Sequence, residues 1–156
     1  MFAQVRESVL RALGTSGATA ALPCFEEMVL RLKDDCCEVQ GQAAVALCRL
    51  AAEAPESFDA QRVGGAVAPL LAAQGVRDAA AEALVALGDV AAPLVVSYVL
   101  VGEKLERQKA VEVLRELGRA ERPKSIFSSI YHIISVTYII SYHYVQCMNR
   151  MQHSIH

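Results

Sequence analysis

The stretch GVRDAAAEALVALGDVAAPLV, residues 75–95, decides the fold. Apolar residues recur in it at positions i, i+4, i+7, i+8 and i+11, namely Val76, Ala80, Ala83, Leu84 and Leu87. That spacing places them on one face of an α-helix. Gly88 follows the last of them, where a left-handed backbone conformation commonly ends a helix. Pro93 then suits the first turn of another helix. The stretch therefore predicts a helix, a stop and a second helix.

The segment ALVALG at 83–88 of this stretch has similar counterparts elsewhere in the chain. They are VLRALG at 9–14, ALCRLA at 46–51 and VLRELG at 113–118. The closing residues of these segments, Gly14, Ala51, Gly88 and Gly118, are 37, 37 and 30 residues apart. A period of this length is typical of two-helix repeat units. Gly14 and Gly118 are expected to stop their helices as Gly88 does. Equivalent apolar faces are predicted at Val39, Ala43, Ala46, Leu47 and Leu50, and at Ala110, Val113, Leu114 and Leu117.

Further helices are expected between these, at residues 21–35, 60–73 and 91–102, each with a proline in or near it. Pro23 and Pro93 fit a first turn, where a missing N–H costs nothing. Pro69 lies deeper, so we expect it to kink its helix or to mark the true start.

A proline-bearing first helix, a short turn and then VRDAAAEALVALG resemble the HEAT repeat, a relative of the armadillo repeat. That pattern places Pro in the first helix, Asp in the turn and Val-Arg at the start of the second helix. Pro69, Val76 and Arg77 match it, although Asp78 follows the arginine and no Asp precedes it.

Two other units match less fully. One has Pro23, Asp34, Asp35 and Val39, with Gln40 in the arginine position, and the last has Glu106 in the valine position beside Arg107. The resemblance implies an all-α, right-handed α-solenoid of about three and a half HEAT-like or armadillo-like repeats over residues 1–123. A plain bundle of Ala-rich and Leu-rich helices is the alternative. Because residue 1 falls inside a second helix, we expect a truncated or alternatively spliced product of a longer array.

Composition and charge exclude several function classes. A net charge of −2 argues against nucleic-acid binding, which demands a basic face. Charged residues at Arg6, Glu7 and Arg11 interrupt any signal peptide. Five cysteines without a CxxC pair predict reduced thiols in a cytoplasmic protein, and no structural zinc. DDCC, residues 34–37, is interpreted as an acidic turn leading into a helix, with a metal site as the alternative.

Residues 1–123 contain no histidine and none of the usual catalytic motifs. Some HEAT-like proteins are hydroxylases with His-Glu pairs and others are lyases, but this sequence has no His-Glu dipeptide. We therefore expect no enzyme activity, no cofactor and no metal. The expected function is a scaffold or adaptor, monomeric as a fragment, that binds another protein.

In HEAT-like arrays the second helices commonly line the concave face. By that resemblance the candidate protein-binding residues are Gln40, Gln42, Arg77, Asp78, Glu82, Arg107, Lys109 and Glu112. The alternative is a solvated helix face, with charges that form only i,i+4 pairs.

Residues 124–156 differ abruptly from the repeats. Every Ile and His of the chain lies there, and no Ala, Gly, Leu, Pro, Asp or Glu does. The apolar run at 126–145 is about as long as a membrane span, and the basic residues before it would keep that flank cytoplasmic. A membrane-tethered adaptor is thus one hypothesis. The other is translated intronic or untranslated sequence, because the favoured residues have AT-rich codons.

Overall fold

The computed structural model describes residues 2–119, and every regular element among them is helical. Four of the helices, which we call the inner helices, are α1 (Ala3–Thr15), α4 (Cys37–Glu53), α7 (Arg77–Leu87) and α9 (Lys104–Arg119). The remaining elements are α2 (Ala18–Ala21), η1 (Leu22–Cys24), α3 (Phe25–Leu30), η2 (Arg31–Lys33), α5 (Pro55–Phe58), α6 (Ala60–Val67), η3 (Ala68–Ala72), η4 (Gly88–Val90) and α8 (Ala91–Val101). The all-α prediction is confirmed for these residues.

The predicted apolar faces form the core. Every member of the faces in α4, α7 and α9 is buried. Small residues let the helices approach closely: a Cβ at Gly41 of α4 would lie 3.0 Å from the Cβ of Ala79 in α7. The helical period in the sequence therefore identified the inward side of α4, α7 and α9 correctly.

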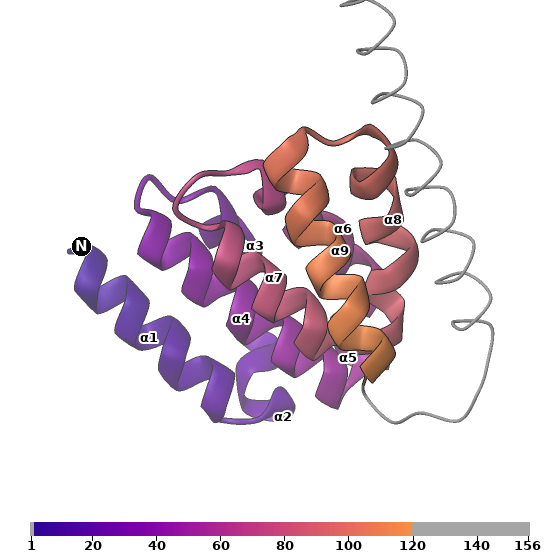
Figure 1. Ribbon diagram of the computed structural model, residues 1–156. Helices are drawn as coiled ribbons and strands as arrows, with labels where there is room; N and C mark the ends of the chain where they lie inside the picture. The colour runs from indigo at the N-terminus through magenta and orange to yellow at the C-terminus, as the bar shows by residue number, and fades with distance from the viewer. Residues whose placement is uncertain (1, 120–156) are drawn as a thin grey trace, which may run out of the picture. The chain divides into compact units, whose positions relative to one another are not determined.

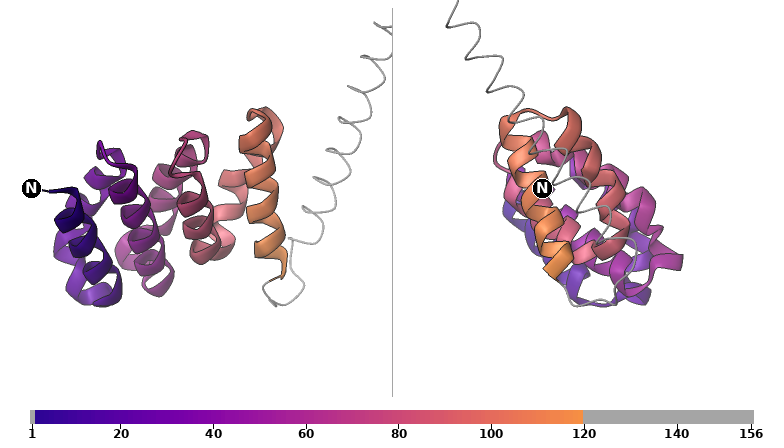
Figure 2. Two further views of the ribbon diagram at one scale, coloured as in Figure 1. Left: turned by 60° about the vertical axis from the view of Figure 1, so that its left-hand side comes forward. Right: turned by 45° about the vertical axis from the view of Figure 1, so that its right-hand side comes forward.

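The inner helices follow one another in a row. α1 packs on α4 and α4 packs on α7, while an ion pair joins Lys109 of α9 to Asp78 of α7. Figures 1 and 2 show these four helices in that order. A second layer lies beside them, because α3 and η2 pack on α4, and α6 and η3 pack on α7. Residues 1–117 form one compact unit.

The glycine predictions are partly wrong. Gly88 has φ +78° and ends α7 as expected. Gly14 lies inside α1 and Gly118 inside α9, so neither is a stop. Gly14 instead permits close packing, since a Cβ there would lie 2.9 Å from the Cβ of Ala46. Positive φ occurs at Gly17 and Gly75, which the sequence did not single out.

The prolines lie where a helix starts or where an α-helix passes into a 3₁₀ helix. Pro23 is in the first turn of η1 and Pro93 is the third residue of α8, as predicted. α6 ends at Val67, and Pro69 lies in the first turn of η3. Lacking an N–H, Pro69 cannot continue the α-helical bonding, so the chain tightens into a 3₁₀ helix. Residues 21–35 likewise form short segments, η1, α3 and η2, where one helix was predicted.

One stretch of the described chain, Arg77–Val101, is long and apolar enough by composition to cross a membrane. It is two helices, α7 and α8, separated at Gly88. Each has 11 residues, or about 16 Å, against a hydrocarbon core of about 30 Å. Part of the stretch, including Ala80, Leu84 and Val95, is buried in the core. The tail at 124–156, including the apolar run at 126–145, lies outside the described residues.

Candidate functional site

Four of the eight predicted binding residues meet in one pocket. The pocket has a volume of about 260 Å³ and is lined by Gly75, Arg77, Asp78, Leu105, Gln108, Lys109 and Glu112. Its walls are the start of α7 and the first half of α9, which are neighbours in Figure 1. Residues about 30 positions apart in sequence thus form one surface.

Lys109 is the electrostatic centre of this pocket. Its Nζ lies 2.9 Å from Oδ1 of Asp78 and 2.7 Å from Oε2 of Glu112. Both contacts raise the pKa of Lys109, that of Glu112 more strongly, and Lys109 lowers the pKa of Asp78. The side chain of Lys109 is only 22% exposed, whereas that of Asp78 is 90% exposed. The cation is therefore engaged within the protein, and carboxylate oxygens face solvent.

Arg77 is also engaged within the protein. Its Nε donates to the carbonyl of Leu71 at 2.7 Å, and its Nη2 donates to the carbonyl of Ala72 at 3.3 Å. Those carbonyls end η3, and helix ends need such partners. Arg77 thus fixes the turn between η3 and α7. Its positive charge affects the pocket only through the electrostatic field.

The other predicted residues do not line this pocket. Gln40 donates from Nε2 to the backbone carbonyl of Asp34 at 2.5 Å and so holds the start of α4. Gln42 is half-buried on α4, whereas Glu82 and Arg107 are exposed on α7 and α9. Leu105 and Gln108 do line the pocket and were missed, because periodicity alone does not show which exposed side chains border a neighbouring helix.

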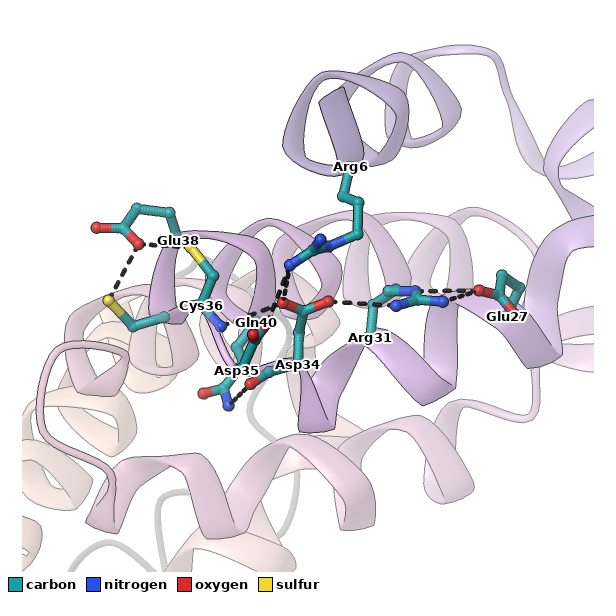
Figure 3. A network of polar contacts seen from close by, with 9 residues as sticks. Arg6, Glu27, Arg31, Asp34, Asp35, Cys36, Glu38 and Gln40 are labelled. Carbon is teal, nitrogen blue, oxygen red and sulfur yellow. Dashed lines mark hydrogen bonds and ion pairs between the residues drawn. The ribbon is translucent and has the colours of Figure 1, made fainter. Parts of the chain in front are cut away.

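A second polar site, centred on Asp34, was predicted only as a turn residue (Figure 3). Arg6 of α1 donates to Oδ1 of Asp34 at 2.7 Å, and Arg31 of η2 donates to Oδ2 at 3.3 Å. The N–H of Cys36 donates to Oδ1 at 3.1 Å. Arg6 also contacts Asp35, and Arg31 contacts Glu27. One carboxylate therefore connects α1, η2 and the start of α4.

The environment of Asp34 favours its ionised form. Its side chain is only 2% exposed. The hydrogen bond from Arg6 is the largest cause that holds its pKa well below the usual range. No sequence signal pointed to this contact, because Arg6 and Asp34 are 28 residues apart and meet only through helix packing.

The DDCC segment forms the expected acidic turn. The Sγ atoms of Cys36 and Cys37 lie 2.9 and 3.2 Å from Oε2 of Glu38. Glu38 raises the pKa of the Cys37 thiol, and burial raises that of Cys48 to about 12. Cys24, Cys36, Cys37 and Cys48 are all free thiols. Within residues 2–119 no three His, Cys, Asp or Glu side chains are grouped so that they could hold a metal ion.

Comparison of the chain with protein-family models, with curated proteins and with solved structures gives no match.

Proposed function

We propose that residues 2–119 form a HEAT-like, right-handed α-solenoid that acts as a non-catalytic protein-binding scaffold. The packing of α1 on α4 and of α4 on α7, with α3 and η2 against α4 and with α6 and η3 against α7, supports this proposal. Repeat units of this kind bury a continuous core by stacking and leave one polar face for partners. The α7–α9 pocket lies on that face and is the proposed binding site.

The proposed partner is a basic segment of another protein. Lys109 and Arg77 already have partners within the protein. The carboxylates of Asp78 and Glu112 share the single cation of Lys109, and their side chains, at 90 and 53% exposed, are far more accessible than that of Lys109 at 22%. Exposed Leu105 on the pocket wall offers an apolar contact. A segment with Lys or Arg beside one apolar side chain would complement both features.

The single observation that carries the proposal is the convergence of Arg77, Asp78, Lys109 and Glu112 in one pocket. In the proposed solenoid these residues belong to separate repeats, so a partner that spans the pocket would contact two repeat units at once. Extended recognition surfaces of repeat proteins are built in this way.

The test uses labelled octapeptides that contain three Lys and one Leu, titrated into the full chain and followed by fluorescence anisotropy. The double variant Asp78→Lys, Glu112→Lys is expected to weaken binding by about tenfold or more, because it replaces attraction by repulsion. Binding should also weaken as salt is added, since the charges are exposed.

Glu56→Lys is the matched control. Glu56 is exposed on α5 and does not line the pocket. Peptide binding should survive this variant, and matching peptides with Glu in place of Lys should not bind. Equal affinity for the control and the pocket variant would overturn the proposed site.

A further inference from the structure

The α7–α9 pocket already holds a cation of the protein's own. Lys109 Nζ lies 2.9 Å from Oδ1 of Asp78 and 2.7 Å from Oε2 of Glu112. Among residues 2–119, Lys109 is the one cation within ion-pair distance of either carboxylate. Together with Arg77, these residues give the pocket two positive and two negative formal charges. A basic segment therefore approaches a pocket whose charges already balance.

The two contacts of Lys109 differ in what holds them together. Glu112 lies three residues after Lys109 on α9, so this pair forms within one helix. Asp78 belongs to α7, and its side chain is 90% exposed. An ion pair with so exposed a partner contributes little to stability and competes with solvent. Because the stem of a lysine is flexible, Nζ can leave Asp78 and stay with Glu112.

The packing of α9 does not depend on the contact between Lys109 and Asp78. One side of α9 is buried through its apolar residues, which are Ala110, Val113, Leu114 and Leu117. Burial of such side chains stabilises a helix contact far more than an exposed ion pair does. Loss of the ion pair should therefore leave both walls of the pocket in place.

We propose that Lys109 is an intramolecular competitor for the basic partner of this pocket, an inference that rests on the function proposed above. The ammonium or guanidinium group of the partner takes the place of Lys109 Nζ at Asp78, while Lys109 keeps its contact with Glu112. Lys109 thus lowers the affinity of the pocket and sets how much positive charge a partner needs in order to bind.

This role predicts a result opposite to that of a purely structural role. If Lys109 only held the pocket in shape, its replacement would weaken binding. If Lys109 competes with the partner, removal of its charge tightens binding. The carboxylates of Asp78 and Glu112 then lose their internal partner, and the incoming cation no longer meets a like charge.

The test is the charge-removing variant Lys109→Gln, titrated with the labelled octapeptide of three Lys and one Leu and followed by fluorescence anisotropy. Affinity is expected to rise by about threefold to tenfold relative to the unmodified chain. Lys109→Met removes the same charge and keeps an unbranched stem, so it should give the same gain. Adding Asp78→Asn to Lys109→Gln should remove most of the gain, because the proposed exchange takes place at Asp78.

Lys109→Arg is the matched control, since it changes the side chain and retains the charge. Its affinity for the peptide should stay within about twofold of that of the unmodified chain. Circular dichroism should show the same helix content for every variant.

The outcomes separate this inference from the proposed function. If the unmodified chain binds the peptide and both charge-removing variants bind it equally or more weakly, Lys109 is no competitor, and the proposed function still stands. If neither the unmodified chain nor Lys109→Gln binds the peptide at millimolar concentration, the proposed function fails and the inference fails with it.

Discussion

Asp34 shows how one residue fixes the geometry of three segments. Its carboxylate accepts from Arg6, from Arg31 and from the N–H of Cys36. A nearly buried charge is tolerated only when such partners replace the lost hydration. The turn between η2 and α4 is therefore specified by charge as well as by packing.

Asp34→Asn is expected to lower the free energy of unfolding by about 1–3 kcal/mol near pH 7, because two arginines lose an ionised acceptor. Urea unfolding measures the change. Asp35→Asn is the matched control, since Asp35 also contacts Arg6 but has an exposed side chain. The Asp35→Asn substitution should lower the free energy of unfolding much less. Equal losses for the two variants would contradict the special role of Asp34.

The contact between Arg6 and Asp34 also predicts how stability depends on pH. The pKa of Asp34 is lowered in the folded protein, chiefly by Arg6. Its contribution is therefore complete above the unfolded-state pKa of about 3.9 and is lost as the pH falls below that value. The stability difference between the unmodified chain and Asp34→Asn should shrink between about pH 5 and pH 3. A difference that stays constant over this range would count against the ionised contact.

Arg77 illustrates how a binding prediction changes once the contacts are known. Its guanidinium bonds the carbonyls of Leu71 and Ala72. Reversing its charge would disturb the end of η3 and test folding more than binding. Asp78, exposed and next in sequence, is the better residue for a binding test.

At the scale of elements, the contact between α1 and α4 depends on the absence of a side chain. A Cβ at Gly14 would lie 2.9 Å from the Cβ of Ala46. Real Cβ atoms do not come so close, so the helices would have to separate. Gly14 is therefore a packing residue, although its place near the end of α1 resembles that of a helix stop.

Gly14→Ala is expected to destabilise the chain by about 1 kcal/mol. Overpacking costs roughly 1–3 kcal/mol, and the gain in helix propensity offsets about 1 kcal/mol of it. Adding Ala46→Gly should recover part of the packing loss, as a double-mutant cycle of thermal or urea unfolding would show.

Gly118→Ala is the control for this prediction. Gly118 is also helical, but a Cβ there would have nothing within 4 Å. This substitution should stabilise the chain by roughly 0.5–1 kcal/mol through helix propensity alone. Stabilisation by both substitutions would show that α1 and α4 are not closely packed at Gly14.

On the scale of the whole molecule, α4 is the central element of residues 1–117. It packs on α1 on one side and α7 on the other, with α3 and η2 across it. Val39, Leu47 and Leu50 are fully buried in this helix. The compact unit ends at Leu117, before the change in composition near residue 123.

A chain that ends at residue 123 is therefore expected to be strongly helical and to melt within a few degrees of the full chain. Circular dichroism against temperature measures both properties. A clearly lower melting temperature for the shortened chain would mean that residues 124–156 contribute to the fold of the first segment.

The sequence by itself determined which residues of α4, α7 and α9 are buried. Helical period and apolar side chains act locally, so Val76, Ala80 and Leu84 could be placed on one face before any packing was known. Gly88 as a stop and Pro69 as an interruption followed for the same reason, since backbone conformation is set within a few residues.

Only the tertiary structure decided what the polar residues do. Arg6 meets Asp34, and Lys109 meets Asp78, across helix contacts that no local pattern encodes. Gly14 likewise looked like a stop because its neighbour Ala46 is distant in sequence. Burial is set by the period of a single helix, whereas a site depends on the distance and register between helices, which exist only after they pack.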